Sequence, residues 1–263
     1  MKKNLLSVIL VALALGSSVA MAVPAPAKNG AAKPGGVGLN AQRSLELNEQ
    51  GATAVRNKDF PLAESFFKQA LQVDSHNLTA AFNLAGMYIT NKNEGAAVEL
   101  LKQYTAQHPD DAGLYSRLGD AYFGTKKIDL AIANYEQAFK LAPNYEALAG
   151  KLGTVYALVN RTADAERMFR LAIKQTPKDA QLYANLSSLC LVNKKSQDAI
   201  TNAKIALQLK PSPDVYITLG NAYQQIKDLK NALIAYQRAV DLGKKDPELQ
   251  AVVDDLKKRT GTA

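Results

Sequence analysis

A small residue recurs through most of this chain at an almost constant interval. It is Gly, Ala or Ser, and successive copies lie 34, 34, 34, 34 and 33 residues apart. The positions are Gly51, Ala85, Gly119, Gly153, Ser187 and Gly220. A second column keeps the same intervals and is always alanine, at Ala63, Ala97, Ala131, Ala165, Ala199 and Ala232. Two columns with one shared period predict a tandem array of six repeated units.

Each unit has the pattern of two helices. Apolar residues recur three and four positions apart, which is the spacing of a helix with one buried face. Prolines end the units, at Pro109, Pro143, Pro177 and Pro211, because proline lacks an N–H group and clashes with the preceding turn. Residues suited to cap the next helix follow, at Asp111, Asn144, Asp179, Ser212 and Asp246, with Pro247 inside the last helix. One helix pair cannot bury its apolar face, so the pairs are expected to stack.

The repeated residues resemble those of the tetratricopeptide repeat (TPR) family. Leu-Gly-x-x-Tyr occurs at Leu118–Tyr122, Leu152–Tyr156 and Leu219–Tyr223, and the resemblance covers about residues 44–246. It implies an all-α fold, a right-handed α-solenoid of stacked helix-turn-helix repeats with a C-terminal capping helix. The repeats are expected at 44–77, 78–111, 112–145, 146–179, 180–212 and 213–246, and the capping helix and tail at 247–263.

The fifth repeat departs most from the pattern. Cys190 replaces the tyrosine, and Ala203 replaces the aromatic residue that follows the alanine column by four. We therefore expect this repeat to be the softest part of the stack. The position of Cys190 predicts a buried, unreactive thiol, and a reactive thiol is the alternative.

The first 43 residues differ from the rest. A secretory signal peptide is predicted over residues 1–22. Its signs are the two positive charges of Lys2 and Lys3, the apolar run 5–15 and the cleavage-site pattern Ala20-Met21-Ala22. The run is too short for an ordinary membrane-spanning helix, although an uncleaved anchor is the alternative. Residues 23–43 are expected to be a disordered, basic linker rich in Pro, Gly and Ala.

The net charge follows this division. Of the formal net charge of +8, five positive charges precede residue 44, so the repeats are nearly balanced. Nucleic-acid binding is therefore not expected. The short positive segment at Lys2 and Lys3 is similar to the beginning of bacterial export signals. This favours a protein of the Gram-negative periplasm over a secreted or signal-anchored protein. Stable membrane insertion after cleavage is not expected.

No catalytic motif is present. The sequence lacks a phosphate-binding loop, a zinc-protease helix motif, a nucleophile elbow and a dinucleotide fingerprint. His76 and His108 lie near repeat ends without an acidic or thiol partner at metal-ligand spacing, and are interpreted as solvated turn residues. The chain is therefore expected to be no enzyme, with no catalytic residue, no metal site and no cofactor.

A binding site is expected on the first helix of each pair, which lines the concave surface in the TPR family. Small side chains leave room for a guest, and the apolar residues Phe82, Ile89 and Phe123 act as anchors. The candidate groove residues are Asn48, Phe82, Asn83, Ile89, Ser116, Arg117, Asp120, Phe123, Thr154, Leu191 and Asn221. The alternative is that these side chains only pack neighbouring helices together.

Part of the family binds chaperone tails through a five-residue carboxylate clamp. The corresponding positions here hold Asn48, Ala52, Asn83, Gly113 and Arg117. Two of them match and both lysines are missing, so this activity is not transferred. Asn83 and Arg117 remain candidates for hydrogen bonds to a peptide backbone or an acidic side chain.

The sequence therefore favours an exported scaffold or adaptor whose groove binds a peptide segment or a partner protein. Envelope assembly, pilus or secretion machinery, and maturation machinery are the settings that the resemblance implies. A self-assembling structural protein and a non-catalytic accessory subunit of an envelope enzyme are the alternatives, and self-association is possible. Fold alone does not choose among them.

Overall fold

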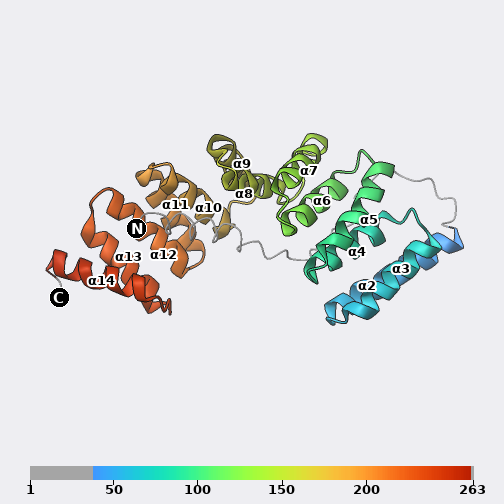
Figure 1. Ribbon diagram of the computed structural model, residues 1–263, viewed down its shortest axis with the longest axis horizontal. Coiled ribbons are helices and arrows are strands. Elements are labelled where there is room, and N and C mark those ends of the chain that lie inside the picture. Colours follow the sequence, from blue (N-terminus) through green and yellow to red (C-terminus); the bar gives the residue numbers. More distant parts are fainter. Residues whose placement is uncertain (1–37, 262–263) are drawn as a thin grey trace. The chain divides into compact units, whose positions relative to one another are not determined.

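The structure is a computed structural model that describes residues 38–261, and all of its regular structure in that range is helical (Figure 1). The signal peptide and most of the linker lie outside the described residues. The first six helices are α2 (Leu39–Arg56), α3 (Phe60–Val73), α4 (Leu78–Thr90), α5 (Glu94–Gln107), α6 (Ala112–Gly124) and α7 (Ile128–Leu141). The others are α8 (Leu148–Leu158), α9 (Thr162–Gln175), α10 (Ala180–Val192), α11 (Ser196–Leu209), α12 (Pro213–Gln225), α13 (Leu229–Asp241) and α14 (Pro247–Thr260).

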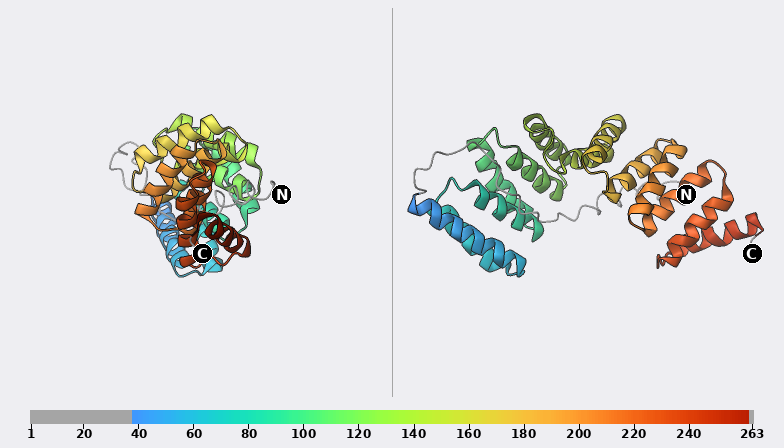
Figure 2. Two further views of the ribbon diagram at one scale, coloured as in Figure 1. Left: turned by 90° about the vertical axis from the view of Figure 1, so that its left-hand side faces the viewer. Right: turned by 180° about the vertical axis from the view of Figure 1, so that it is seen from behind.

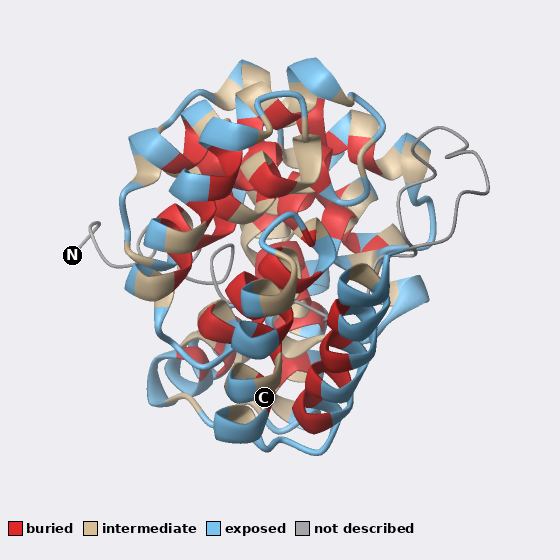
Figure 3. Ribbon diagram, turned by 90° about the vertical axis from the view of Figure 1, so that its right-hand side faces the viewer, coloured by how far each residue is buried: buried red, intermediate tan, exposed pale blue. Residues whose placement is uncertain are grey.

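Consecutive helices form hairpin-like pairs, from α2 with α3 to α12 with α13, and α14 follows the last pair (Figure 2). The chain divides after Leu148 into two compact units, which we describe separately. The second helices of the pairs have one buried and one exposed face, whereas the first helices α4, α6, α8 and α10 are buried or half-buried along most of their length (Figure 3). The expected all-helical fold of stacked pairs is confirmed.

Inside the pairs, the small residue of the first helix faces the residue that follows the alanine column by four positions. Where the small residue is glycine, the aromatic ring of the second helix lies directly on it. A methyl group built on Gly119 would come within 2.5 Å of the Tyr135 ring, and one on Gly153 within 2.6 Å of the Phe169 ring. The alanines of the second column, such as Ala131, are fully buried. Glycine is needed at these contacts because any side chain would displace the ring.

Side-chain capping accounts for six of the helix starts in the described range. The side chains of Asp59, Asn77, Asp111, Asp179, Asp228 and Asp246 each accept a hydrogen bond from a backbone N–H in the first turn of the following helix. Such caps satisfy donors that have no partner inside the helix. The predicted caps at Asp111, Asp179 and Asp246 are therefore confirmed, and Pro247 is the first residue of α14.

Two predicted caps behave differently. Asn144 does not cap a helix, because 143–147 form turns and α8 begins only at Leu148. Ala147, just before α8, has the left-handed backbone conformation, with a φ of 60°. Ser212 does precede α12, but its side chain makes no capping hydrogen bond. Pro213 takes the first helical position there, where its missing N–H costs nothing.

The first helix begins earlier than expected. α2 starts at Leu39, so residues 39–43 are helical although they were assigned to the linker. The Gln42 N–H donates to the Gly38 carbonyl at 3.1 Å, and Arg43 pairs with Glu46 at 3.2 Å. These contacts extend the helix by more than one turn before the repeat pattern begins.

The last apolar face is covered by α14. Leu249, Val253 and Leu256 lie on one side of this helix and are buried against Tyr236 and the alanines of α13. The opposite side is polar. This arrangement is that of a capping helix at the end of a repeat stack.

Candidate functional site

The first helices of the three N-terminal pairs supply the candidate surface. α4 contacts both α2 and α6, so these three helices form one row within the N-terminal unit. They carry eight of the eleven predicted groove residues. We call this row the α2–α4–α6 surface and define it by Asn48, Phe82, Asn83, Ile89, Arg117 and Phe123. Phe82, Asn83, Ile89, Arg117 and Phe123 are half-buried, and Asn48 is buried beside them.

Two contacts join the helices of this surface. The Asn83 amide nitrogen donates to the Asn48 carbonyl oxygen at 3.0 Å, linking α4 to α2. The Arg117 guanidinium of α6 lies over the Phe82 ring of α4, with its carbon 3.9 Å from the ring centroid. A cation over an aromatic face is attracted by the ring quadrupole. Both contacts join side chains that are 35 residues apart in the sequence.

Arg117 is half-buried, with Phe82, Asp120, Tyr135 and Tyr145 near its side chain. Burial lowers the pKa of its guanidinium, and Asp120, Tyr145 and Tyr135 act in the opposite direction. An arginine nevertheless stays protonated, because its ordinary pKa lies above 12. Its Nε is buried and has no hydrogen-bond partner. The surface therefore holds a positive charge that is poorly solvated.

Asp120 and Tyr135 form a buried hydrogen bond inside the third helix pair. The Tyr135 hydroxyl donates to Asp120 Oδ1 at 2.8 Å, and both side chains are buried. Burial, together with the neighbouring carboxylate, raises the pKa of Tyr135 well above its usual range. Asp120 therefore joins the two helices of the third pair rather than facing a ligand.

Three other predicted residues also contribute to packing. Ser116 is only 2% exposed, and Leu191 only 3% exposed. Thr154 is buried and donates from its hydroxyl to the Gly150 carbonyl of its own helix at 3.0 Å. Their helical positions were assigned from the repeat register, and an error of about one residue moves a side chain from the open face to the helix contact.

Asn221 lies in the C-terminal unit with Thr154 and Leu191. Its Oδ1 accepts a hydrogen bond from the Tyr236 hydroxyl at 2.6 Å, which joins α12 to α13. Burial raises the pKa of Tyr236. The C-terminal unit thus places its predicted residues in contacts within or between its own helices, and the α2–α4–α6 surface remains the candidate site.

The carboxylate clamp is not reproduced. Asn48 stands where the clamp has its first lysine, and its carbonyl oxygen accepts the Asn83 amide N–H. Gly113 stands at the second lysine position, and the Tyr145 hydroxyl lies 3.0 Å from where its Cβ would be. The repeat pattern gave no indication of Tyr145, because a residue just after a proline reads as part of a turn.

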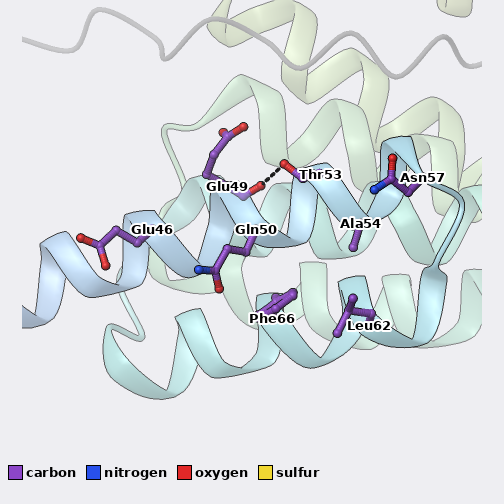
Figure 4. A pocket seen from close by; sticks show the side chains of 8 residues that line it. All are labelled: Glu46, Glu49, Gln50, Thr53, Ala54, Asn57, Leu62 and Phe66. Atoms are coloured by element: carbon purple, nitrogen blue, oxygen red, sulfur yellow. Dashed lines mark hydrogen bonds between the residues drawn. The ribbon is translucent and has the colours of Figure 1, made fainter.

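A depression on the described part of the chain lies elsewhere. It has a volume of about 500 Å³ and is formed by α2 and α3 (Figure 4). Its lining residues are Glu46, Glu49, Gln50, Thr53, Ala54, Asn57, Leu62 and Phe66. None of them was among the predicted groove residues, although five of them lie on α2, the helix of Asn48. The sequence signal that could have pointed to this depression is its place on the first helix pair. No other helix pair of the described residues precedes α2 and α3 in the chain.

Among residues 38–261, no group of three or more His, Cys, Asp or Glu side chains is placed so that it could hold a metal ion. His76 is exposed, as expected for a turn residue. His108 departs from that expectation, because its Nε2 is buried without a hydrogen-bond partner. No helix in the described range has the length and apolar character needed to cross a membrane.

Comparison with known proteins identifies the class. Models of the tetratricopeptide repeat match residues 54–122, 122–190 and 213–246, which is more than half of the chain. The chain therefore belongs to the tetratricopeptide repeat family. It is a scaffold of the kind that binds proteins and peptides.

The individual proteins to which the chain is similar share only a small part of its sequence. The human protein O-mannosyl-transferase TMTC1 is 27% identical over 168 residues, which cover 62% of this chain and 19% of that protein. The chain thus spans about a fifth of the length of that curated relative. Pseudomonas aeruginosa PilF has a similar fold, with a TM-score of 0.71, 15% identity, and coverage of 82% of this chain and 99% of PilF. YrrB, described as a TPR protein with an unusual peptide-binding site, gives a TM-score of 0.64, 16% identity and coverage of 72% and 97%.

Proposed function

We propose that this protein is an exported TPR adaptor that binds a peptide segment or partner protein on its α2–α4–α6 surface. The observation that carries the proposal is the Arg117–Phe82 stack beside the Asn48–Asn83 pair. Together they place a cation, an aromatic ring and amide groups on half-buried side chains of three adjacent helices. Phe82, Ile89 and Phe123 provide apolar area for binding, and the amides can hydrogen-bond a peptide backbone.

The envelope of a Gram-negative bacterium is the proposed setting. The support is the sequence of residues 1–22, and PilF of Pseudomonas aeruginosa is a bacterial protein with a similar fold. Fractionation of producing cells and sequencing of the mature N-terminus test this part. We expect periplasmic protein that begins at Val23. Full-length protein in the cytoplasm would contradict it.

A capture experiment tests the binding surface. The full chain is compared with a variant in which Phe82, Ile89 and Phe123 are all changed to Glu. The matched control changes three exposed leucines of the same unit, Leu45, Leu130 and Leu141, to Glu. After equal helicity is shown, we expect envelope proteins to be retained by the parent and the control and lost by the first variant. Retention by all three would exclude this surface.

One observation favours self-association as a second function. The depression on α2 and α3 contains Phe66 and also Leu62, which is 45% exposed. Apolar side chains at the end of a repeat stack can bury area against another copy. Sedimentation equilibrium of the parent and of Phe66→Glu tests it. A monomer at all concentrations would exclude it, and oligomers that the substitution abolishes would support it.

A further inference from the structure

The first and the last helix pairs are covered differently. On the last pair, α14 buries Leu249, Val253 and Leu256 against α13. Before the first pair, no helix of the described residues precedes α2, and most side chains that line the depression between α2 and α3 are exposed (Figure 4). A terminal pair has no neighbouring repeat on one side, so its apolar residues there need a separate cover. The first pair lacks the cover that α14 gives to the last.

The depression combines apolar and acidic side chains. Leu62 is 45% exposed and Phe66 is half-buried, so both can still be removed from water. Glu46 and Glu49 also line the depression, and none of its eight lining residues is basic. Their ion pairs with arginines outside the lining are exposed and therefore weak. An occupant that fits this depression is apolar and carries positive charge.

Residues 23–37 of the chain have this chemistry. They contain Lys28 and Lys33, three prolines and no acid. Proline-rich sequences favour the extended polyproline II conformation, which binds grooves with aromatic side chains at a low cost in entropy. The composition that gives this segment no core of its own does not prevent it from docking on a folded surface.

The segment also has the length and the attachment that docking needs. It directly precedes Gly38 and α2. Its fifteen residues span roughly 46 Å in polyproline II, whereas the 18 residues of α2 span about 27 Å. Gly35 and Gly36 allow the chain to reverse its direction before α2. Because the segment is tethered beside the depression, its effective concentration there is high, and a weak contact is sufficient.

We propose that residues 23–37 fold back along α2 and cover the depression between α2 and α3. Their apolar residues lie against Leu62 and Phe66, and their lysines lie near Glu46 and Glu49. This inference goes beyond the proposed function. The chain's own segment competes with a second copy for the depression, so self-association through Phe66 requires that the segment leave first.

The experiment uses the isotope-labelled chain from Val23, the predicted mature start, with a nitroxide spin label on Asn29→Cys. Cys190 is 1% exposed, so the label attaches to the new cysteine. The label broadens the backbone amide signals of residues near it. We expect the amides of Leu62 and Phe66 to be broadened as strongly as those at the start of α2. A segment that moves freely would broaden mainly the start of α2 and the facing end of α3.

Two sets of variants test the contacts. Leu62→Gln is expected to reduce the broadening at Phe66. The matched control is Leu130→Gln, because Leu130 is equally exposed in the same unit and lies outside the depression. Lys28→Gln and Lys33→Gln alter no described residue and so leave the helices intact. Each is expected to lower the ratio of docked to free segment roughly two- to fivefold, as for an exposed ion pair.

Three results would overturn the proposal. Broadening that is the same in the parent and in Leu62→Gln would show that the segment is not held in the depression. Broadening centred on the α2–α4–α6 surface would place the segment there instead. The third test mixes spin-labelled chain without the isotope and isotope-labelled chain without the spin label. Broadening of Leu62 and Phe66 in this mixture would identify a second copy as the occupant.

Discussion

The third and fifth helix pairs fill the same contact with side chains of opposite size. In the third pair Gly119 lies under the Tyr135 ring. In the fifth pair Ser187 stands in the glycine column and Ala203 in the aromatic column, and both are fully buried. The Ser187 hydroxyl donates to the Ala199 carbonyl of α11 at 2.8 Å, so the two helices still meet closely.

The second pair lies between these extremes, with Ala85 and Leu101 at the two positions, both fully buried. The larger the residue on the first helix, the smaller its partner on the second. What is kept is therefore the volume at the contact, as close packing requires. The fifth pair has exchanged sizes rather than lost a contact. It still buries less apolar area there, because an aromatic ring buries roughly 150–250 Å² and alanine far less.

The largest expected effect follows from adding a side chain under the ring of the third pair. Gly119→Leu would force Tyr135 away from α6, and we expect it to lower the free energy of unfolding by about 3 kcal/mol. Gly95→Leu is the matched control, because Gly95 is also helical and has open space where a Cβ would lie. It is expected to be neutral or slightly stabilising. Urea titration measures both, and equal effects would contradict the packing of the ring on Gly119.

The size exchange in the fifth pair can be tested by reversing it. Ala203→Phe alone is expected to destabilise by about 1–3 kcal/mol, because Ser187 occupies the space that the ring needs. Adding Ser187→Gly should recover much of that loss. The double-mutant cycle then gives a coupling of about 1 kcal/mol or more. Additive effects would show that the two positions do not share one volume.

The fifth pair is expected to open more readily than the third, with a free energy of opening about 1–2 kcal/mol lower. Hydrogen exchange of α10 against α6 measures the difference. Cys190 gives a second measurement, because it is 1% exposed and burial raises the pKa of its thiol to about 11. Its modification at pH 8 should therefore be limited by opening of this pair. Stronger protection of α10 than of α6 would contradict the expectation.

The smallest expected effect concerns an ion pair that ties the fifth pair to its neighbour. Lys195, just before α11, contacts Glu166 of α9 at 2.7 Å, and Arg170 contacts the same carboxylate. The hydrogen bond from Lys195 is the main cause that lowers the pKa of Glu166, followed by that from Arg170. A lowered folded-state pKa stabilises the fold above the unfolded-state pKa of about 4.3, and this stabilisation is lost as the pH falls.

Glu166→Gln should therefore cost under about 1 kcal/mol at pH 7 and nothing near pH 3, because both states are then protonated. Urea midpoints of the parent and the variant at the two pH values check the sign. Glu99→Gln on exposed α5 is a control with a weaker contact, to Lys102 at 3.6 Å. A difference that persists at pH 3 would show that the effect of Glu166→Gln is not electrostatic.

Much of the fold was predictable because it depends on local spacing. The two columns placed the helix pairs, and most of the expected caps lie at helix starts. The predictions failed where local signals compete. Asn144 follows a proline and looks like a cap, yet a left-handed Ala147 delays the helix to Leu148. The linker composition also concealed the start of α2 at Leu39.

The candidate site was less predictable. Phe82, Asn83 and Arg117 were predicted from their register on the first helices, and the structure brings them together with Asn48. Ser116, Asp120 and Thr154 have equally plausible positions but lie buried in helix contacts. A rotation of about 100° separates consecutive residues of a helix, so small differences in packing decide whether a side chain reaches the surface.

The sequence by itself determined the repeat, the helix pairs, the burial of Cys190 and the membership of the TPR family. These depend on periodic patterns that each repeat carries in full. Only the tertiary structure decided that Arg117 lies on Phe82, and that Asn83 pairs with Asn48. Those contacts join residues of different repeats, and their geometry depends on how neighbouring helices pack, which no single repeat encodes.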